Sequence, residues 1–173
     1  MTFSGLREAL PLLLVAAGTQ SDVAARLGFA APVLARELGM PLLPGLAPLP
    51  HPDQALGLLM DAGSGSGLSW LGLDPGMALS DGGTWAQALG AWRQPTLLLI
   101  DAAQLSTGMA AATTALLLQH DVPVRGLIQW GEPWQPEQRR RDGLPWLGSL
   151  GPEGQSPEGD LRLALALQGA VAG

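Results

Sequence analysis

The stretch VAAGTQSDVAARLG, residues 15–28, has the position of a phosphate-binding loop. It follows the apolar run LPLLLVAA, which is typical of a buried strand, and it precedes a segment with helical periodicity. A phosphate-binding loop uses backbone N–H groups at the helix start and a lysine that reaches the terminal phosphates. This stretch has neither the lysine nor the paired glycine, so it leaves open whether phosphate binds here at all.

The residue types that are missing restrict the chemistry further. The sequence has no lysine, cysteine, asparagine or tyrosine, and its nine basic residues are all arginine. Without lysine there is no Schiff base, no lysine general base and no phosphate-loop lysine. Without cysteine there is no disulfide, no thiolate metal site and no cysteine nucleophile. His51 and His120 have no sequence neighbours that form a nucleophile–base pair, so no catalytic residue is assigned.

Charge and hydropathy argue against two classes of partner. The net charge is −6 and the basic run is confined to residues 139–141, whereas nucleic-acid binding depends on neutralising phosphates. No apolar stretch reaches the roughly 18 residues that a membrane span needs. The sequence also lacks a secretory signal pattern. We therefore expect a cytoplasmic protein that binds neither nucleic acid nor a membrane.

The apolar periodicity predicts alternating strands and helices. A helix is expected over 22–38, with Asp22 able to cap its start, Pro32 able to kink or split it and Gly39 suited to end it. The five prolines within 41–53 allow no more than a short edge strand, and 68–80 and 131–143 are expected to be irregular. The other predictions are strands at 10–16, 55–60, 96–100, 122–129 and 144–147, and helices at 81–92, 104–120 and 158–170.

Strands separated by helices predict an α/β fold with a mostly parallel sheet and helices on both faces, in a single domain over 1–173. Ligands of such sheets bind at the carboxyl ends of the strands. Four segments are therefore expected along one edge: 18–23, 61–67, 101–104 and 130–134. Asp101 is expected to cap the following helix. Trp130 and Trp134 could stack on a flat ligand or be partly buried against their own loop.

These segments, in this order, resemble those of dethiobiotin synthetase, a P-loop NTPase-like family in biotin biosynthesis. LLMDAGSGSGL is similar to the family's strand and Glu-Gly-Ala-Gly-Gly turn, and GTWAQALGAWRQPTLLLID to its helix and Pro-led strand. LSTGMAAATTALLLQHDVPVRGLIQW and GLPWLGSLG resemble the segments that follow. AAGTQSDVAARL overlays the loop Thr-Gly-Thr-Asp-Thr-x-Val-Gly-Lys-Thr. Synthetases of the cobyrinic acid a,c-diamide type share much of the second half.

The resemblance implies a three-layer P-loop NTPase-like domain, a homodimer, and a site for ATP and Mg²⁺. It places the metal-binding acidic position at Asp61, which is one methylene shorter than the family's glutamate. Trp130 aligns with the family's base-reading asparagine. The implied cofactor-binding residues are Gly18, Thr19, Ser21, Asp22, Val23, Arg26 and Trp130.

The sequence departs from the family at the residues that carry the chemistry. The family's Gly-Lys-Thr aligns with Ala24, Ala25 and Arg26, so the lysine and the magnesium-binding hydroxyl are missing. Arg26 is a cation, but its direction around a helix differs by about 100° from that of the lysine one position earlier. The loop therefore looks like a phosphate loop that has lost its triphosphate chemistry.

Two hypotheses remain from the sequence. In the first, the chain is a degenerate dethiobiotin-synthetase-like protein that does not use ATP efficiently and serves as a binding or partner module, with a small-molecule ligand in the crevice as one option. In the second, it is an active synthetase that closes the ureido ring of diaminopelargonic acid with CO₂, ATP and Mg²⁺. The loop amides would then hold phosphate, Arg26 would replace the lysine, and Asp61 would hold Mg²⁺.

Overall fold

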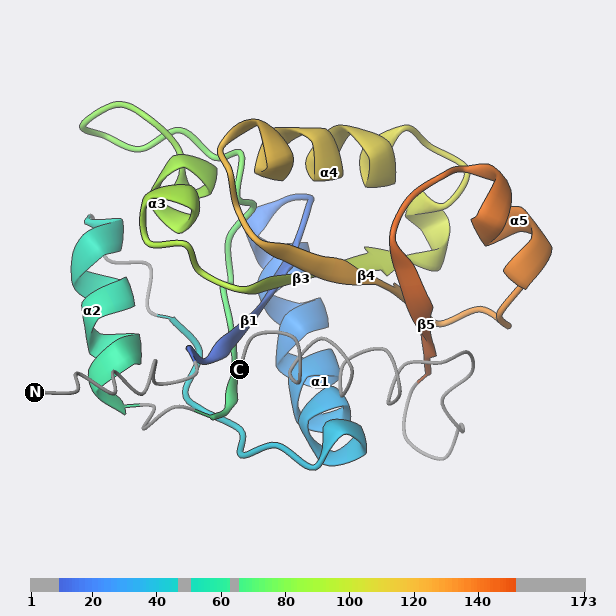
Figure 1. Cartoon of the computed structure of the whole chain (residues 1–173), viewed down its shortest axis with the longest axis horizontal. Coiled ribbons are helices and arrows are strands. Elements are labelled where there is room, and N and C mark those ends of the chain that lie inside the picture. Colours follow the sequence, from blue (N-terminus) through green and yellow to red (C-terminus); the bar gives the residue numbers. More distant parts are fainter. Residues whose placement is uncertain (1–9, 47–50, 63–65, 152–173) are drawn as a thin grey trace, which may run out of the picture.

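The computed structural model describes residues 10–46, 51–62 and 66–151, and in these residues it forms an α/β fold around one parallel sheet (Figure 1). The sheet has five strands in the order β2-β1-β3-β4-β5. The strands are β1 (Leu12–Ala16), β2 (Leu68–Trp70), β3 (Thr96–Asp101), β4 (Val124–Trp130) and β5 (Trp146–Leu150). The helices are α1 (Gln20–Leu38), α2 (Pro52–Ala62), α3 (Trp85–Ala91), the 3₁₀ turn η1 (Ala102–Gln104), α4 (Met109–Gln119) and α5 (Pro136–Arg141).

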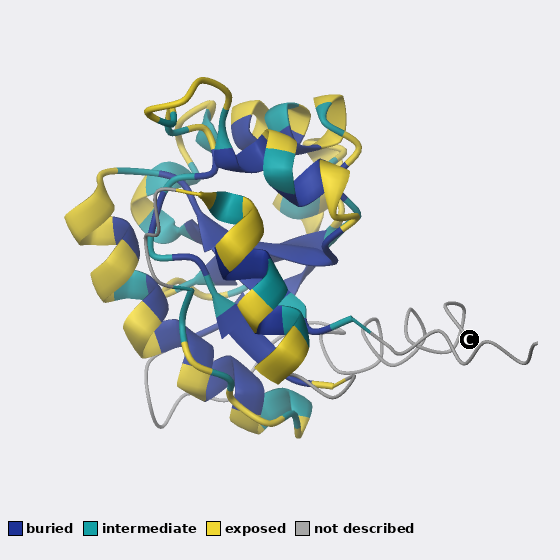
Figure 2. Cartoon of the chain, turned by 90° about the vertical axis from the view of Figure 1, so that its left-hand side faces the viewer, coloured by how far each residue is buried: buried dark blue, intermediate teal, exposed yellow. Residues whose placement is uncertain are grey.

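Helices cover both faces of the sheet, because successive strand side chains point to opposite faces. On β1, Leu13 and Val15 pack with residues of α2, α3 and α4, whereas Leu14 and Ala16 pack with α1. All four side chains are fully buried. Figure 2 shows the same layering, with buried strands inside and helices whose outer sides are exposed. The fold is thus a three-layer α/β domain, consistent with a P-loop-like architecture.

The strand order places a topological switch point at the end of β1. The chain passes from β1 to β2 on one side and then returns to β3 on the other side of β1. Loops that leave β1 and β3 therefore run in opposite directions, and ligands of doubly wound sheets bind in the space that this creates. The loop predicted at residues 18–23 lies at the carboxyl edge of the sheet, where β1 ends at Ala16 and β3 ends at Asp101.

The long first helix is continuous. Its N-cap is Thr19, whose hydroxyl accepts from the Asp22 N–H, so Asp22 lies in the first turn rather than at the cap. Pro32 lies inside α1 and does not split it, because its neighbours Ala31 and Val33 pack on the sheet. Gly39 adopts a left-handed conformation (φ 66°) and ends the helix as predicted.

Three predictions of secondary structure were wrong. Residues 55–60 are not a strand but part of α2, in which Ala55, Leu56 and Leu59 are buried on one side. A short apolar run fits either element, and tertiary packing decides between them. Residues 68–70 are not irregular but form β2, whose Leu68 pairs with Leu12 in parallel register. The stretch 131–143, which was expected to be irregular, contains the helix α5.

Other boundaries shifted while the element type was correct. The helix predicted from 81 begins only at Trp85, because Thr84 and Gln87 form a capping box there. The helix predicted from 104 begins only at Met109, after the turn η1, and the final strand lies a few residues later than predicted. Segment 41–53 does contain edge pairing, through bridges of Leu42 to Leu68 and Leu46 to Leu71, before α2 starts. The helix predicted at 158–170 lies outside the described residues.

Candidate functional site

The loop between β1 and α1 is tied to the next loop along the sheet. Gly18 has φ 137°, a conformation that favours glycine. Its N–H donates to Oδ2 of Asp74 at 2.8 Å. The other oxygen of that carboxylate, Oδ1, accepts from the Gly76 N–H at 2.7 Å. The backbone donor at the predicted phosphate position is therefore bonded to a carboxylate of the protein itself.

Arg26 reaches the same loop from the second turn of α1. Its Nε lies 3.2 Å from Oδ2 of Asp101, and its Nη1 donates to the Ala17 carbonyl at 3.4 Å. The exposed fractions of the two side chains are 16% for Arg26 and 29% for Asp101. The sequence predicted Asp101 at this edge, whereas Arg26 was implied as a binding residue only by the resemblance. The structure brings the two together because β1 and β3 are neighbours.

Asp101 also organises the turn that follows β3, as its predicted capping role requires. Its Oδ1 accepts from the Ala103 N–H at 2.8 Å, while its own N–H donates to the Gln104 side chain at 3.1 Å. The Gln104 amide in turn donates to the Ala17 carbonyl at 2.9 Å. We call Gly18, Arg26, Asp74, Asp101 and Gln104 the edge cluster.

The remaining polar residues of the loop bond to one another. Thr19 Oγ1 donates to Asp22 Oδ2 at 2.5 Å and lies 3.3 Å from Ser21 Oγ. These side chains are exposed, whereas Val23 is fully buried in the cluster beneath α1. Val23 thus anchors the helix start, and the loop's exposed groups are hydroxyls and a carboxylate.

Asp61 does not lie where the sequence placed it. The prediction assumed that it follows a strand, but it belongs to α2, near the end of that helix, and is exposed. Within residues 10–46, 51–62 and 66–151, no group of three or more histidine or acidic residues is arranged to hold a metal ion. The carboxylate near the start of the loop that follows β2 is Asp74, which the sequence analysis did not single out.

The two tryptophans expected to flank a base pocket pack in different places. Trp130 packs against the apolar cluster beneath α1. Trp134 meets Trp146 edge to face, with ring centroids 6.4 Å apart, and the Arg139 guanidinium lies 5.1 Å from the Trp146 ring centre. Trp146 packs on the opposite face of the sheet from Trp130.

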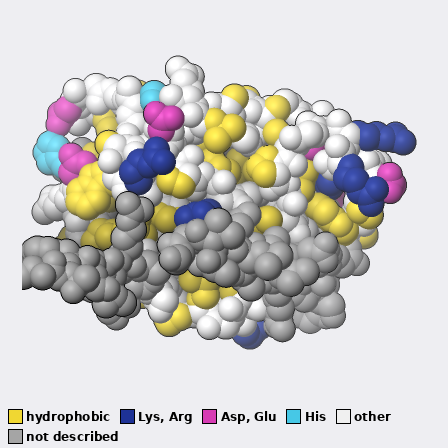
Figure 3. All heavy atoms as spheres, in the orientation of Figure 1, with side chains coloured by type: hydrophobic (Ala, Val, Ile, Leu, Met, Phe, Trp, Pro, Cys, Tyr) yellow, Lys and Arg dark blue, Asp and Glu magenta, His cyan; other side chains and the backbone are white. Residues whose placement is uncertain are grey.

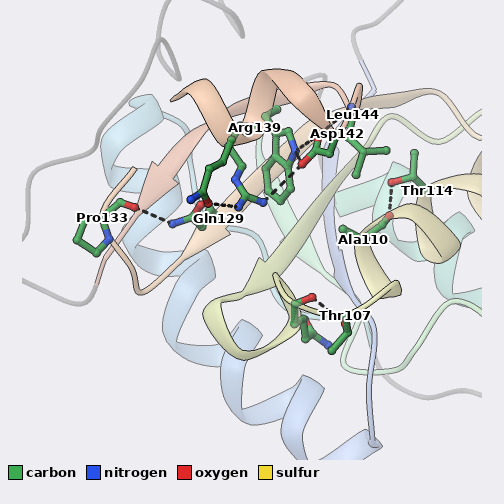
Figure 4. Close-up of polar contacts among 11 residues, drawn as sticks. Thr107, Ala110, Thr114, Gln129, Pro133, Arg139, Asp142 and Leu144 are labelled. Atoms are coloured by element: carbon green, nitrogen blue, oxygen red, sulfur yellow. Dashed lines mark hydrogen bonds and ion pairs between the residues drawn. The ribbon is translucent and has the colours of Figure 1, made fainter. Parts of the chain in front are cut away.

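Polar contacts around Arg139 connect α5 to β4 and β5. Arg139 and Asp142 lie together in Figure 4, and Trp146 Nε1 donates to both carboxylate oxygens of Asp142 at 2.9 Å. Gln129 Nε2 donates to the carbonyl oxygens of Glu132 and Pro133 at 2.7 and 3.3 Å. Figure 3 shows the basic side chains of α5 gathered at the surface of this end. These contacts hold the β4–β5 connection together, although the buried Nε of Arg139 has no hydrogen-bond partner among the described residues.

A cavity of about 330 Å³ lies away from the edge cluster, between the start of α2 and the loop before α3. His51 Nδ1 lies 3.2 Å from Asp81 Oδ2 at its wall, and both side chains are about two-thirds exposed. None of the edge-cluster residues lines this cavity.

No family model matches the sequence, and no curated protein is similar to it. In the described residues, no helix combines the length and hydrophobicity needed to cross a membrane.

The Arg26–Asp101 pair is expected to stabilise the protein measurably. In a double-mutant cycle with Arg26→Ala and Asp101→Ala, we expect a coupling free energy of about 1 kcal/mol from urea unfolding. The pair is mostly buried but still in contact with water, which moderates its strength. A coupling indistinguishable from zero would show that the two side chains do not interact in solution.

Proposed function

We propose that this chain is a dethiobiotin-synthetase-like domain whose loop no longer supports efficient use of ATP, and that it acts as a binding or partner module. The observation that carries the proposal is the ion pair of Arg26 with Asp101. Ala25 stands where the lysine would be, and Arg26 is the cation that the fold brings to the loop. Because its charge is compensated by Asp101, little positive charge remains for a triphosphate.

The missing metal position supports the same proposal. A nucleoside triphosphate is normally bound with Mg²⁺, which a loop hydroxyl and a strand-end carboxylate hold. The aligned hydroxyl position is Arg26, and Asp61 lies in a helix. Asp74 lies at the expected edge, but both of its oxygens accept backbone N–H groups.

One observation favours the alternative, an active ATP-dependent synthetase. Arg26 does contact the loop, because its Nη1 donates to the Ala17 carbonyl at 3.4 Å. It does so although Arg26 stands one residue after the position that the lysine occupies in the family. If a nucleotide displaced Asp101 from the guanidinium, Arg26 would be close enough to contact a phosphate of a ligand bound at Gly18.

Calorimetric titration with Mg·ATP separates the two. We expect no saturable heat up to millimolar nucleotide from folded protein, and no turnover of diaminopelargonic acid with bicarbonate. Saturable binding that Arg26→Ala abolishes would contradict the proposal and support the enzyme. Arg140→Ala is the matched control, because Arg140 is an exposed arginine paired with Glu137 on α5, and its loss changes the net charge equally.

A further inference from the structure

The described helices cover the two faces of the sheet unequally. On one face, α2, α3 and α4 all contribute side chains to the apolar cluster. On the other face, the cluster contains side chains from all five strands, but α1 is the only described helix that contributes to it. α1 packs along β1 and β2. Within the described residues, the α1 side of β4 and β5 therefore has no helix of its own.

The side chains of β4 and β5 on this face are nevertheless buried. Ile128 is 0% exposed, Leu150 1% and Leu147 7%. We call these three residues the β4–β5 patch. Parallel sheets are covered on both faces, because their strands are apolar on both sides and their connections place helices there. A covering element is therefore expected over the β4–β5 patch.

The chain beyond β5 contains a segment with the matching requirement. β5 ends at Leu150, and residues 152–173, which follow Gly151, lie outside the described residues. From Leu161 to Ala170, the only charged residue is Arg162. Leucine and alanine, which make up most of this stretch, favour helix strongly. A helix that is apolar on nearly all sides belongs in a protein interior. The segment predicted to be helical, 158–170, thus needs an apolar surface to pack on.

The lengths of the segment and of the patch agree. The linking residues 152–157 span up to about 20 Å, which is enough to turn from the end of β5 onto the face of the sheet. A helix over 158–170 would be about 20 Å long. The seven residues of β4 extend over about 23 Å. A strand added beside β5 would instead extend the sheet and leave the β4–β5 patch uncovered.

We propose that residues 158–170 form a helix that covers the β4–β5 patch beside α1. The occupant of this face is then the chain itself, and neither a second copy nor another protein docks there. This packing does not depend on whether the β1–α1 loop binds a nucleotide, so it goes beyond the proposed function.

The two isoleucines of the sequence provide the test, because Ile100 and Ile128 lie on opposite faces of the sheet. The chain has no cysteine, so Arg162→Cys carries a single nitroxide label. We expect the label to remove most of the Ile128 δ1-methyl signal and less of the Ile100 signal, since paramagnetic broadening falls steeply with distance. The matched control is the same label on Ala112→Cys, at an exposed position of α4, which should affect Ile100 more than Ile128.

The unmodified protein guards against an effect of the label. Its Ile128 methyl should show nuclear Overhauser contacts to leucine methyls of 158–170, and the Cα shifts of this segment should be helical. Equal broadening of the two isoleucine signals by the Arg162→Cys label overturns the proposal, as do extended Cα shifts. Broadening of Ile128 in an isotope-labelled chain mixed with a separate spin-labelled chain also overturns it, because the covering segment would then come from a second copy.

Discussion

Replacing Gly90 by alanine is expected to lower the free energy of unfolding by about 3 kcal/mol. Gly90 is a buried residue of α3, and a Cβ built on it would lie 1.7 Å from the backbone carbonyl oxygen of His120, at the end of α4. A backbone oxygen cannot move aside as a flexible side chain can. The two helices would have to separate, which would loosen the packing of Leu89 and Leu117 between them.

The matched control is Gly57→Ala in α2, because it makes the same change in another helix. A Cβ at Gly57 would be 3.8 Å from the nearest atom, in the ring of Trp92, which is an ordinary contact. Alanine favours helix over glycine by about 1 kcal/mol, so this variant should be as stable as the wild type or more so. Urea unfolding of both variants measures the difference, and equal effects would show that α3 and α4 are not as close as described.

Replacing Trp85 by alanine is expected to cost about 4 kcal/mol of stability. Trp85 is fully buried at the first position of α3, in the cluster that α2, α3 and α4 form on the sheet. The loss combines the removed apolar surface with the cavity that remains. α3 also fixes the Asp74 loop, because the Ala86 N–H donates to the Pro75 carbonyl at 2.8 Å. We therefore expect faster hydrogen exchange at Gly18 as well.

Trp92→Ala provides the comparison. Trp92 is 37% exposed, and its indole N–H donates to Asp53 at 2.6 Å. Its removal should cost about 1 kcal/mol, as for a single hydrogen bond and a partial contact. Unfolding in urea gives both values, with an unchanged slope if the unfolded states are alike. A Trp85→Ala variant no less stable than Trp92→Ala would contradict the core that we describe.

The polar groups of the sheet edge have partners within the protein. Gly18, Arg26 and Ala17 each offer a group that a ligand could use, and each is bonded within the protein. Internal partners of this sort keep buried polar groups satisfied without a ligand. The loop then stabilises the sheet edge whether or not anything binds.

The sequence alone determined the elements whose signal is local. The sequence predicted β1, β3 and β4 from their apolar runs, and α1 from its 3.6-residue apolar pattern. These patterns arise because each element buries one or both of its faces, whichever elements pack against it. The sequence also placed the loop at 18–23 and Asp101 at one edge, since parallel strands end together. The roles implied for Gly18, Thr19, Ser21, Asp22, Val23 and Trp130 stay predictions.

Only the tertiary structure decided what depends on distant partners. Residues 55–60 are apolar enough for a strand or a helix, and packing beside α3 makes them helical. Because this segment is a helix, Asp61 does not lie at the carboxyl edge of the sheet. The carboxylate that follows the second strand is Asp74. The bond from Gly18 to Asp74 joins residues 56 positions apart. No local pattern encodes such a contact, because it exists only once β1 and β2 are paired side by side.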